Sequence, residues 1–269
     1  MVTLTNGQFF GQTNSRTNLG GVTLTDTEYT HDRVNWHYHE NAYFTLLLEG
    51  HVIEGNKKEI YHCPAGTLLF HNWQEAHYNI KPNGFTRGFH IEIDEGWINT
   101  QEVRLKLSEG SINISHPQIK IRAYHIFKEF KMADTTSHLA IDSLLVDVLS
   151  GMSDIQEKRH RAIPEWAVTL RDILNDAPKE EWTLICLAKM LNIHPVHLSR
   201  NFSKYFGCNL GDYIRIIKVQ NAFSLLANKN LSLTDITYSC GFADQSHFIR
   251  CFKAVNHVKP SQFRRFFKK

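Results

Sequence analysis

A short motif that occurs twice, 50 residues apart, constrains this chain of 269 residues more than any other feature of its sequence. Residues 197–202 and residues 247–252 share the order His-apolar-x-Arg-x-Phe. Each copy follows a short apolar-periodic stretch and a few residues typical of a tight turn. Two helices joined by such a turn form a helix-turn-helix unit, whose second helix can lie in the major groove of DNA. The chain is therefore predicted to carry two of these units.

Capping and turn residues support both units. In the first, Thr183 is placed to cap a helix over 184–191, and Pro195 starts the next helix after a short turn. In the second, residues 232–235 (Ser-Leu-Thr-Asp) resemble a capping box, and Gly241 follows the end of that helix. The second turn is predicted to be one residue longer than the first.

The outward faces of the two second helices carry side chains that can read DNA. Arginine can contact guanine through two hydrogen bonds, glutamine can do so with adenine, and an apolar side chain can contact the thymine methyl group. Apolar residues four positions apart face the core, and the base-reading candidates on the other side are Val196, Ser199, Arg200, Gln245, Ser246 and Arg250. The candidates for phosphate contacts are His197, Lys204, His247 and Lys253. A solvated helix face is the ordinary alternative for one arginine, but two arginines at matched positions favour DNA contact.

The stretch between the units and the distribution of charge agree with a DNA partner. Residues 212–227 form a predicted helix of about 24 Å, which suits a spacer between helices held near one DNA turn, about 34 Å, apart. Residues 162–269 hold 15 Lys and Arg against 8 Asp and Glu, a balance of +7, whereas residues 1–161 hold 15 against 19, a balance of −4. A basic C-terminal part beside an acidic N-terminal part favours polyanion binding at one end only.

At this point residues 162–269 resemble the DNA-binding domain of the AraC/XylS family of bacterial transcription regulators. The stretches that carry the resemblance are 187–188, 198–204, 206–207, 222 with 225–226, 241–248, 250–253 and 260–264. The resemblance implies that two units read adjacent major grooves of double-stranded promoter DNA, and that the protein recruits RNA polymerase or otherwise regulates a promoter. It also implies a homodimer.

The chain departs from the family pattern at three places. Ile217 and Lys218 stand in the linking helix where an arginine is usual, and Asn256 and His257 stand where a glycine is common. Val196 is apolar, which implies a thymine methyl contact in the first unit. These departures change details of recognition and not the class of protein.

Residues 1 to about 110 read as all-β. Runs rich in aromatic and β-branched residues, such as 43–50, 67–70 and 84–93, alternate with turn residues, and 55–58 resembles a hairpin turn. Many short strands at this spacing indicate a sandwich or a barrel.

The same region is similar to the cupin domains. Residues 36–50 contain His-x-His and a later glycine, as in the first cupin motif, and residues 64–77 resemble the second. Cupin enzymes bind a metal through two such histidines, a glutamate and a later histidine, and the corresponding effector or metal candidates are His37, His39, Tyr43 and His77. Tyr43 stands at the glutamate position, which disfavours an iron site of two histidines and one carboxylate.

Three interpretations of these histidines remain open: structural or pocket-lining residues, a divalent metal site, and an active metalloenzyme. Aromatic residues of the region either line a ligand cavity or belong to the core; they are Trp36, Tyr38, Tyr43, Trp73, Tyr78 and Phe89. The cofactor and the effector are not identified by the sequence.

After Pro117 the apolar period becomes helical, at 119–130 and again at 141–152 with Ser137 as an N-cap candidate. These apolar stripes pack either on the β domain or on a second copy of the chain. The polar segment 153–161 is interpreted as an inter-domain linker.

The fold expected is α+β with two domains: an N-terminal cupin-like β-barrel followed by helices, and an all-α C-terminal domain with two helix-turn-helix motifs. The predicted boundaries are 1–116 for effector sensing, 117–161 for a helical dimerisation and linker segment, and 162–269 for DNA binding.

The cysteines and the apolar runs of the sequence indicate the cellular compartment of the protein. The five cysteines form no Cys-x-x-Cys pair, which suggests reduced thiols in a cytoplasm. The chain has no apolar run of 18 residues and no secretory pattern, so no membrane partner is expected.

The resulting hypothesis is a cytoplasmic, sequence-specific transcription regulator that is not an enzyme. Its cupin-like domain senses a small molecule or a metal and thereby controls promoter binding or RNA polymerase recruitment. The alternative is a cupin metalloenzyme with an appended nucleic-acid-binding module.

Overall fold

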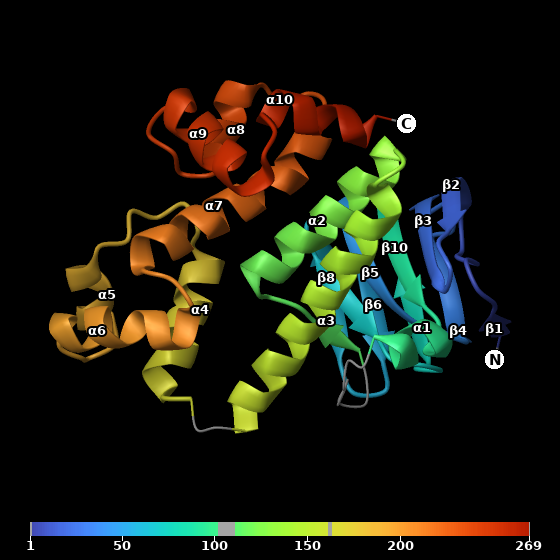
Figure 1. The fold of residues 1–269 in the computed structure, drawn as a ribbon, viewed down its shortest axis with the longest axis horizontal. Helices are drawn as coiled ribbons and strands as arrows, with labels where there is room; N and C mark the ends of the chain where they lie inside the picture. The colour runs from blue at the N-terminus through green and yellow to red at the C-terminus, as the bar shows by residue number, and fades with distance from the viewer. Residues whose placement is uncertain (1, 102–110, 161–162, 269) are drawn as a thin grey trace. The chain divides into compact units, whose positions relative to one another are not determined.

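The computed structural model describes residues 2–101, 111–160 and 163–268 of the chain, without the side chains of residues 154–160. The chain divides into two units, Met1–Ser153 with Phe266–Lys269, and Asp154–Arg265. Strands and helices build the first unit and helices build the second (Figure 1), so the predicted α+β class with a helical C-terminal part is confirmed.

Two sheets and three helices make up the first unit. The strands are β1 (Val2–Leu4), β2 (Gln12–Asn18), β3 (Val22–Glu28), β4 (Arg33–His39), β5 (Ala42–Glu49), β6 (His51–Asn56), β7 (Ile60–Pro64), β8 (Leu68–His71), β9 (His77–Ile80), β10 (Arg87–Ile93) and β11 (Ile112–Asn113). They form a five-stranded sheet in the order β1-β4-β9-β6-β7 and a six-stranded sheet in the order β11-β8-β5-β10-β3-β2. The helices are α1 (Glu95–Thr100), α2 (Pro117–Met132) and α3 (Ser137–His160).

The six-stranded sheet has two different faces because successive side chains of a strand point to opposite sides. On one face Phe89 of β10 contacts Phe127 and Phe130 of α2, with ring centroids 5.2 Å apart in both pairs. On the other face the ring of Tyr43 on β5 lies 4.4 Å from the ring of His39 on β4. This sheet therefore lies between the helices and the five-stranded sheet, as the positions of α2, β5 and β10 in Figure 1 show.

The apolar stripes predicted between residues 117 and 152 are buried inside the chain itself. Ile126 and Phe127 of α2 and Leu145 and Leu149 of α3 have no exposed surface. Both stripes are thus covered within the described part of the chain, and the homodimer stays a prediction.

Some local predictions change. The polar segment expected as a linker is helical as far as His160, since α3 continues through it, and residues 161–162 lie outside the described part. Ser137 is the first residue of α3 rather than its cap, and its hydroxyl accepts a hydrogen bond from the backbone N–H of Asp134 at 3.1 Å. The short helix α1 interrupts the region predicted as all-β because Asp94 caps it, accepting from the backbone N–H of Trp97 at 2.7 Å.

A buried network of charges ties the sheet to α2. Asp26 of β3 accepts from Arg87 of β10 at 2.8 and 2.6 Å, and Lys131 of α2 lies 2.8 Å from the same carboxylate. Burial alone would raise the pKa of Asp26, but the hydrogen bonds and charges of Arg87 and Lys131 outweigh burial and hold this pKa below its ordinary value. Arg87 also lies 3.8 Å from Glu49 and donates to the carbonyl of Phe267 at 2.7 Å.

In the second unit the helices are α4 (Glu165–Asp176), α5 (Leu184–Met190), α6 (Pro195–Phe206), α7 (Leu210–Ala227), α8 (Leu233–Ser239), α9 (Gln245–Asn256) and α10 (Pro260–Phe263). A 3₁₀ turn over Arg264–Phe267 follows, and its last two residues belong to the first unit. Two apolar clusters share α7. Tyr213 and Ile217 pack with the first helix-turn-helix unit, and Phe223 contacts Phe252 of α9 with ring centroids 5.3 Å apart. Among the described residues no helix combines the length and apolar character that crossing a membrane requires.

Asp26→Asn is expected to destabilise the protein by about 3–5 kcal/mol, because it removes the carboxylate charge that both Arg87 and Lys131 contact in a buried place. The matched control is Asp147→Asn, which removes an exposed ion pair with Arg122 and should cost less than about 1 kcal/mol. Urea-induced unfolding of the full chain measures both changes. Equal losses in the two variants would contradict a structural role for the buried network.

Candidate functional site

The first helix-turn-helix unit consists of α5 and α6. Thr183 caps α5 as predicted, accepting from the backbone N–H of Cys186 at 3.1 Å. The turn is closed by Asn192, whose φ of +52° lies in the left-handed region that asparagine tolerates, and by a bond from the Ile193 N–H to the Ala188 carbonyl at 3.0 Å.

The second unit, α8 and α9, repeats this geometry. Ser232 and Asp235 form the predicted capping box of α8. Gly241 takes the left-handed position with a φ of +74°, and the Phe242 N–H bonds to the Thr237 carbonyl at 3.1 Å, which matches the bond in the first unit. The connection spans 240–244 here and 191–194 in the first unit, so the prediction of one extra residue is confirmed.

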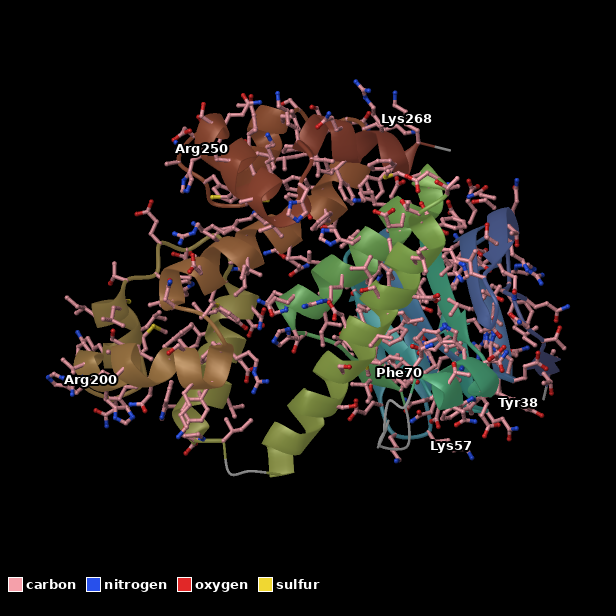
Figure 2. All side chains as sticks on the ribbon, in the orientation of Figure 1. Tyr38, Lys57, Phe70, Arg200, Arg250 and Lys268 are labelled. Carbon is pink, nitrogen blue, oxygen red and sulfur yellow. The ribbon has the colours of Figure 1, made fainter. Side chains whose placement is uncertain are left out.

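Buried residues four positions apart fix the rotation of each second helix. Leu198 and Phe202 of α6, and Phe248 and Phe252 of α9, are at most 1% exposed. The arginines at matched positions, Arg200 and Arg250, are exposed, and Figure 2 shows both on the left-hand side of this unit, directed away from it.

The other base-reading candidates share this exposure. Val196 is 47% exposed, an unusual position for an apolar side chain. Ser199, Gln245 and Ser246 are exposed as well. The structure therefore brings all six predicted residues to the outer faces of α6 and α9.

The predicted phosphate-contacting residues divide into two groups. His197, Lys204 and Lys253 are exposed, and the Nζ of Lys204 lies 5.3 Å from the centre of the Tyr205 ring. His247 is half-buried because its ring meets the edge of Phe242 at 5.4 Å, which makes it partly a structural residue of the second turn.

Two departures from the family pattern have structural partners. Lys218 of α7 donates to the carbonyl of Gly241 and so holds the second turn, while its neighbour Ile217 is buried. His257 ends α9 with a φ of +61°, the position that Gly207 fills at the end of α6 with a φ of +75°. The family glycine is thus replaced by a histidine in a left-handed conformation.

A second candidate site lies between the two sheets of the first unit. It is a pocket whose wall includes His37, His39, Tyr43 and His77, the residues expected there from the sequence. The ring centroids of His37 and His77 are 4.2 Å apart, and those of His39 and His77 are 5.8 Å apart. The His-x-His spacing and the pairing of His37 with His77 across β4 and β9 bring the three rings together.

Hydrogen bonds define the tautomers of two of these rings. Nδ1 of His37 lies 2.8 Å from the carbonyl oxygen of Asn35, and Nδ1 of His77 lies 3.0 Å from that of Glu75. A carbonyl oxygen can only accept a hydrogen bond, so both Nδ1 atoms carry the proton. Each Nε2 therefore keeps a lone pair, and that of His77 accepts from the Tyr43 hydroxyl at 3.0 Å. Such backbone partners are typical of histidines that bind metals.

Several residues of the site were not expected from the sequence. Phe9 stacks on His90 with ring centroids 3.7 Å apart, and Glu54 also lines the pocket. His71 lies behind it, with its ring stacked on Tyr43 at 4.3 Å. Period-two alternation within β6, β8 and β10 could have marked Glu54, His71 and His90 as inward-facing, but the register between strands was needed to bring them together.

Of the aromatic residues predicted to line a cavity or to form core, Tyr43 lines the pocket. Phe89 belongs to the core on the helix side of its sheet. Trp36 is 40% exposed and meets Tyr78 on the outside of the five-stranded sheet, so neither lines this pocket. Tyr38 and Trp73 are likewise absent from its wall.

Burial controls the protonation of the pocket residues. Desolvation, with repulsion from neighbouring histidines, lowers the pKa of His39 to about 2 and that of His77 to about 3. Burial lowers the pKa of His90 to about 3 and raises that of Glu54 to about 8. At neutral pH the imidazoles are neutral, which is the form that binds metals.

Two sets of residues in the described part of the chain bring ligand atoms close enough for one metal ion. They are His37, His39 and His77, and Glu54, His71 and His77, with the ligand atoms of each set within 4.8 Å of one another. The first set matches the cupin-like candidates but has Tyr43 in place of the carboxylate, so it fits an iron site of two histidines and one carboxylate poorly.

Comparison with known proteins agrees with the helix-turn-helix geometry. Residues 187–265 match the family model described as a helix-turn-helix domain. The chain is 29% identical over 235 residues to the uncharacterized HTH-type transcriptional regulator YijO of Escherichia coli, a match that covers 82% of this chain and 80% of that protein.

Other similarities differ in how much of the chain they cover. The bifunctional transcriptional activator/DNA repair enzyme AdaA of Bacillus subtilis is 31% identical over 100 residues, which are 37% of this chain and 47% of that protein. Among solved structures, fatty-acid-bound ToxT of Vibrio cholerae is 14% identical and has a TM-score of 0.40, with 93% of this chain and 97% of that chain covered.

The cap of the second recognition helix offers a local test. Asp244 accepts from the backbone N–H of His247 at 2.7 Å, and Asp244→Ala should destabilise the C-terminal unit by about 1 kcal/mol. Asp244→Asn is the matched control, because asparagine caps helices as well as aspartate does. Thermal unfolding of the full chain compares the variants, and equal loss in both would show that the charge matters rather than the cap.

Proposed function

We propose that this chain, a DNA-binding transcriptional regulator of the AraC/XylS type, inserts α6 and α9 into successive major grooves of promoter DNA and reads bases through Arg200 and Arg250. The observation that carries the proposal is the matched placement of these two exposed arginines beside buried pairs four residues apart. The linking helix α7 has 18 residues, or about 27 Å, which suits helices held about one DNA turn apart.

The remaining exposed residues have roles that follow from their chemistry. Val196 contacts a thymine methyl group, and Gln245 contacts adenine, with Ser199 and Ser246 as adaptable partners. Lys204, Lys253 and His197 contact phosphates, which sets affinity and orientation rather than sequence choice. His247 contributes a weaker phosphate contact because its ring packs on Phe242.

The pocket of the first unit is proposed to bind an effector, either a small molecule or a divalent metal. It is enclosed by two sheets and walled by aromatic rings and imidazoles, as binding sites for small ligands commonly are. The effector regulates the protein only to the extent that it binds two states of the chain with different affinity.

The domain assignment proposed is 1–116 for sensing, 117–161 for dimerisation and connection, and 162–269 for DNA binding. Homodimerisation and contact with RNA polymerase, like a cytoplasmic location, are supported by the family resemblance. Sedimentation analysis of the full chain tests the dimer, and a monomer at micromolar concentration would exclude it.

The alternative is a cupin metalloenzyme with an appended nucleic-acid module. The two sets of residues that could bind a metal ion support this alternative. We favour sensing without catalysis because Tyr43 stands where the cupin carboxylate is expected. Metal analysis of the purified protein, followed by His37→Ala, separates the two functions.

Arg200→Ala and Arg250→Ala should each weaken binding to a cognate site by about 1–3 kcal/mol, or about 5- to 150-fold in Kd, and relax specificity at one base. Genome-wide footprinting identifies the site, and fluorescence anisotropy measures binding. The matched control is Arg122→Ala, which removes the same charge from an ion pair in the first unit. Wild-type affinity in both helix variants would refute the base-reading roles.

Lys253→Ala should weaken binding to cognate and unrelated DNA alike, because a phosphate contact carries no sequence information. The slope of log Kobs against log salt should fall in magnitude by about 1. A loss confined to the cognate site, with an unchanged slope, would reassign Lys253 to base contact.

A further inference from the structure

We infer that Glu54, His71 and His77 bind a divalent transition-metal ion, with an open coordination position toward the pocket. The inference rests on the proposed sensing function and deepens it by naming the ligand. The residue set differs from the His-x-His set of the cupin pattern and shares only His77 with it.

The ligand atoms of this set are already close. The carboxylate of Glu54 lies 3.4 Å from Nδ1 of His71, and the rings of His71 and His77 are 4.9 Å apart. Three different strands, β6, β8 and β9, supply the three residues, so their positions are fixed by the sheets rather than by a loop. Metal sites on rigid elements hold their geometry best.

Orphaned polar atoms point to a missing partner in this place. Oε1 of Glu54 and Nε2 of His71 are buried and lack a hydrogen-bond partner. Buried polar atoms are nearly always bonded, and leaving one unbonded costs about 1–3 kcal/mol. A cation held by these residues beside Glu54 would give Oε1 the partner that it lacks.

Each of the three residues also has an outer partner that orients it. Asn79 donates to Oε2 of Glu54 at 3.2 Å, Ser111 lies 3.1 Å from Nδ1 of His71, and the Glu75 carbonyl accepts from Nδ1 of His77 at 3.0 Å. Outer partners of this kind fix ring orientation and tautomer at metal sites.

Charge favours the set that contains Glu54. A divalent ion held by three neutral imidazoles would keep its full charge in a dry interior, which is costly. The carboxylate of Glu54 removes one unit of that charge. Two histidines and one carboxylate suit zinc or ferrous iron with an open position.

Binding would exchange one interaction for another at His77. Its Nε2 lone pair accepts from the Tyr43 hydroxyl in this structure, and the same lone pair would hold the ion. His90 does not belong to this set, and both of its ring nitrogens lie within 3.3 Å of hydroxyl groups, those of Tyr29 and Thr45.

The test is metal binding by the full chain, measured by calorimetric titration with Zn²⁺ and by the visible absorption of Co²⁺. We expect one ion per chain, with nitrogen and oxygen ligands and no thiolate absorption. Loss of an outer partner typically lowers metal affinity about 10- to 100-fold, and Asn79→Ala should show a loss of this size. Glu54→Gln and His71→Asn each remove a ligand and should lower the metal affinity further.

The control is His39→Asn, which alters only the other set and should keep affinity within about threefold. Near-ultraviolet circular dichroism checks that each variant is folded; Glu54→Gln preserves side-chain shape and decides the matter if His71→Asn does not fold. No stoichiometric ion in the wild type, wild-type affinity in Glu54→Gln, or loss of binding in His39→Asn would each overturn the inference. DNA binding is not part of this readout, so failure of the metal site and failure of the proposed regulator function are separable.

Discussion

The burial of an apolar pair on each of α6 and α9 is the constraint on which the proposed DNA-facing surface depends. Leu198 with Phe202, and Phe248 with Phe252, leave each helix one rotation about its axis. Once that rotation is fixed, a residue two positions after Leu198 or Phe248 must point outward, and both positions are arginine. Recognition chemistry and core packing are therefore set by the same few residues, and a change in the core would re-aim the arginines without touching them.

In the pocket, the two-residue period of the β-strands decides which side chains point inward. In β5 the alternation of side chains sends Tyr43 and Thr45 toward the pocket and Phe44 and Leu46 toward the helices, where Leu46 is paired with Phe89. Enclosure between two sheets then removes water from the inward residues. Desolvation lowers the pKa values of the histidines and raises that of Glu54, so the walls of the pocket are largely uncharged at neutral pH. A buried cation would favour the charged carboxylate of Glu54 and so lower its pKa again.

The parts of the structure that sequence predicted best are those with local causes. The helix-turn-helix units depend on caps, turns and a four-residue period, and Thr183, Ser232 and Gly241 perform the roles their types suggest. Glu54 and His71 were missed because they meet through the registers of β6 with β9 and of β8 with β5, which no local pattern encodes. Phe89 fell on the opposite face from Tyr43 for the same reason. The helical path through 153–160 shows a further limit, since a polar stretch is compatible with both a linker and a solvated helix.

Strand β5 faces the pocket on one side and the apolar core of the first unit on the other. Tyr43 bonds to His77 on one face of it, and its neighbour Phe44 packs on Phe70 on the other, with ring centroids 4.7 Å apart. Close-packed interiors transmit small displacements because they contain few voids to absorb them. A ligand that takes the His77 lone pair would release the Tyr43 hydroxyl on this strand, whose other face carries Phe44. Such a ligand binds more tightly to the state in which the hydrogen bond between Tyr43 and His77 is broken than to the state in which it is formed. This difference in affinity sets the upper limit of any effect of the ligand on DNA binding.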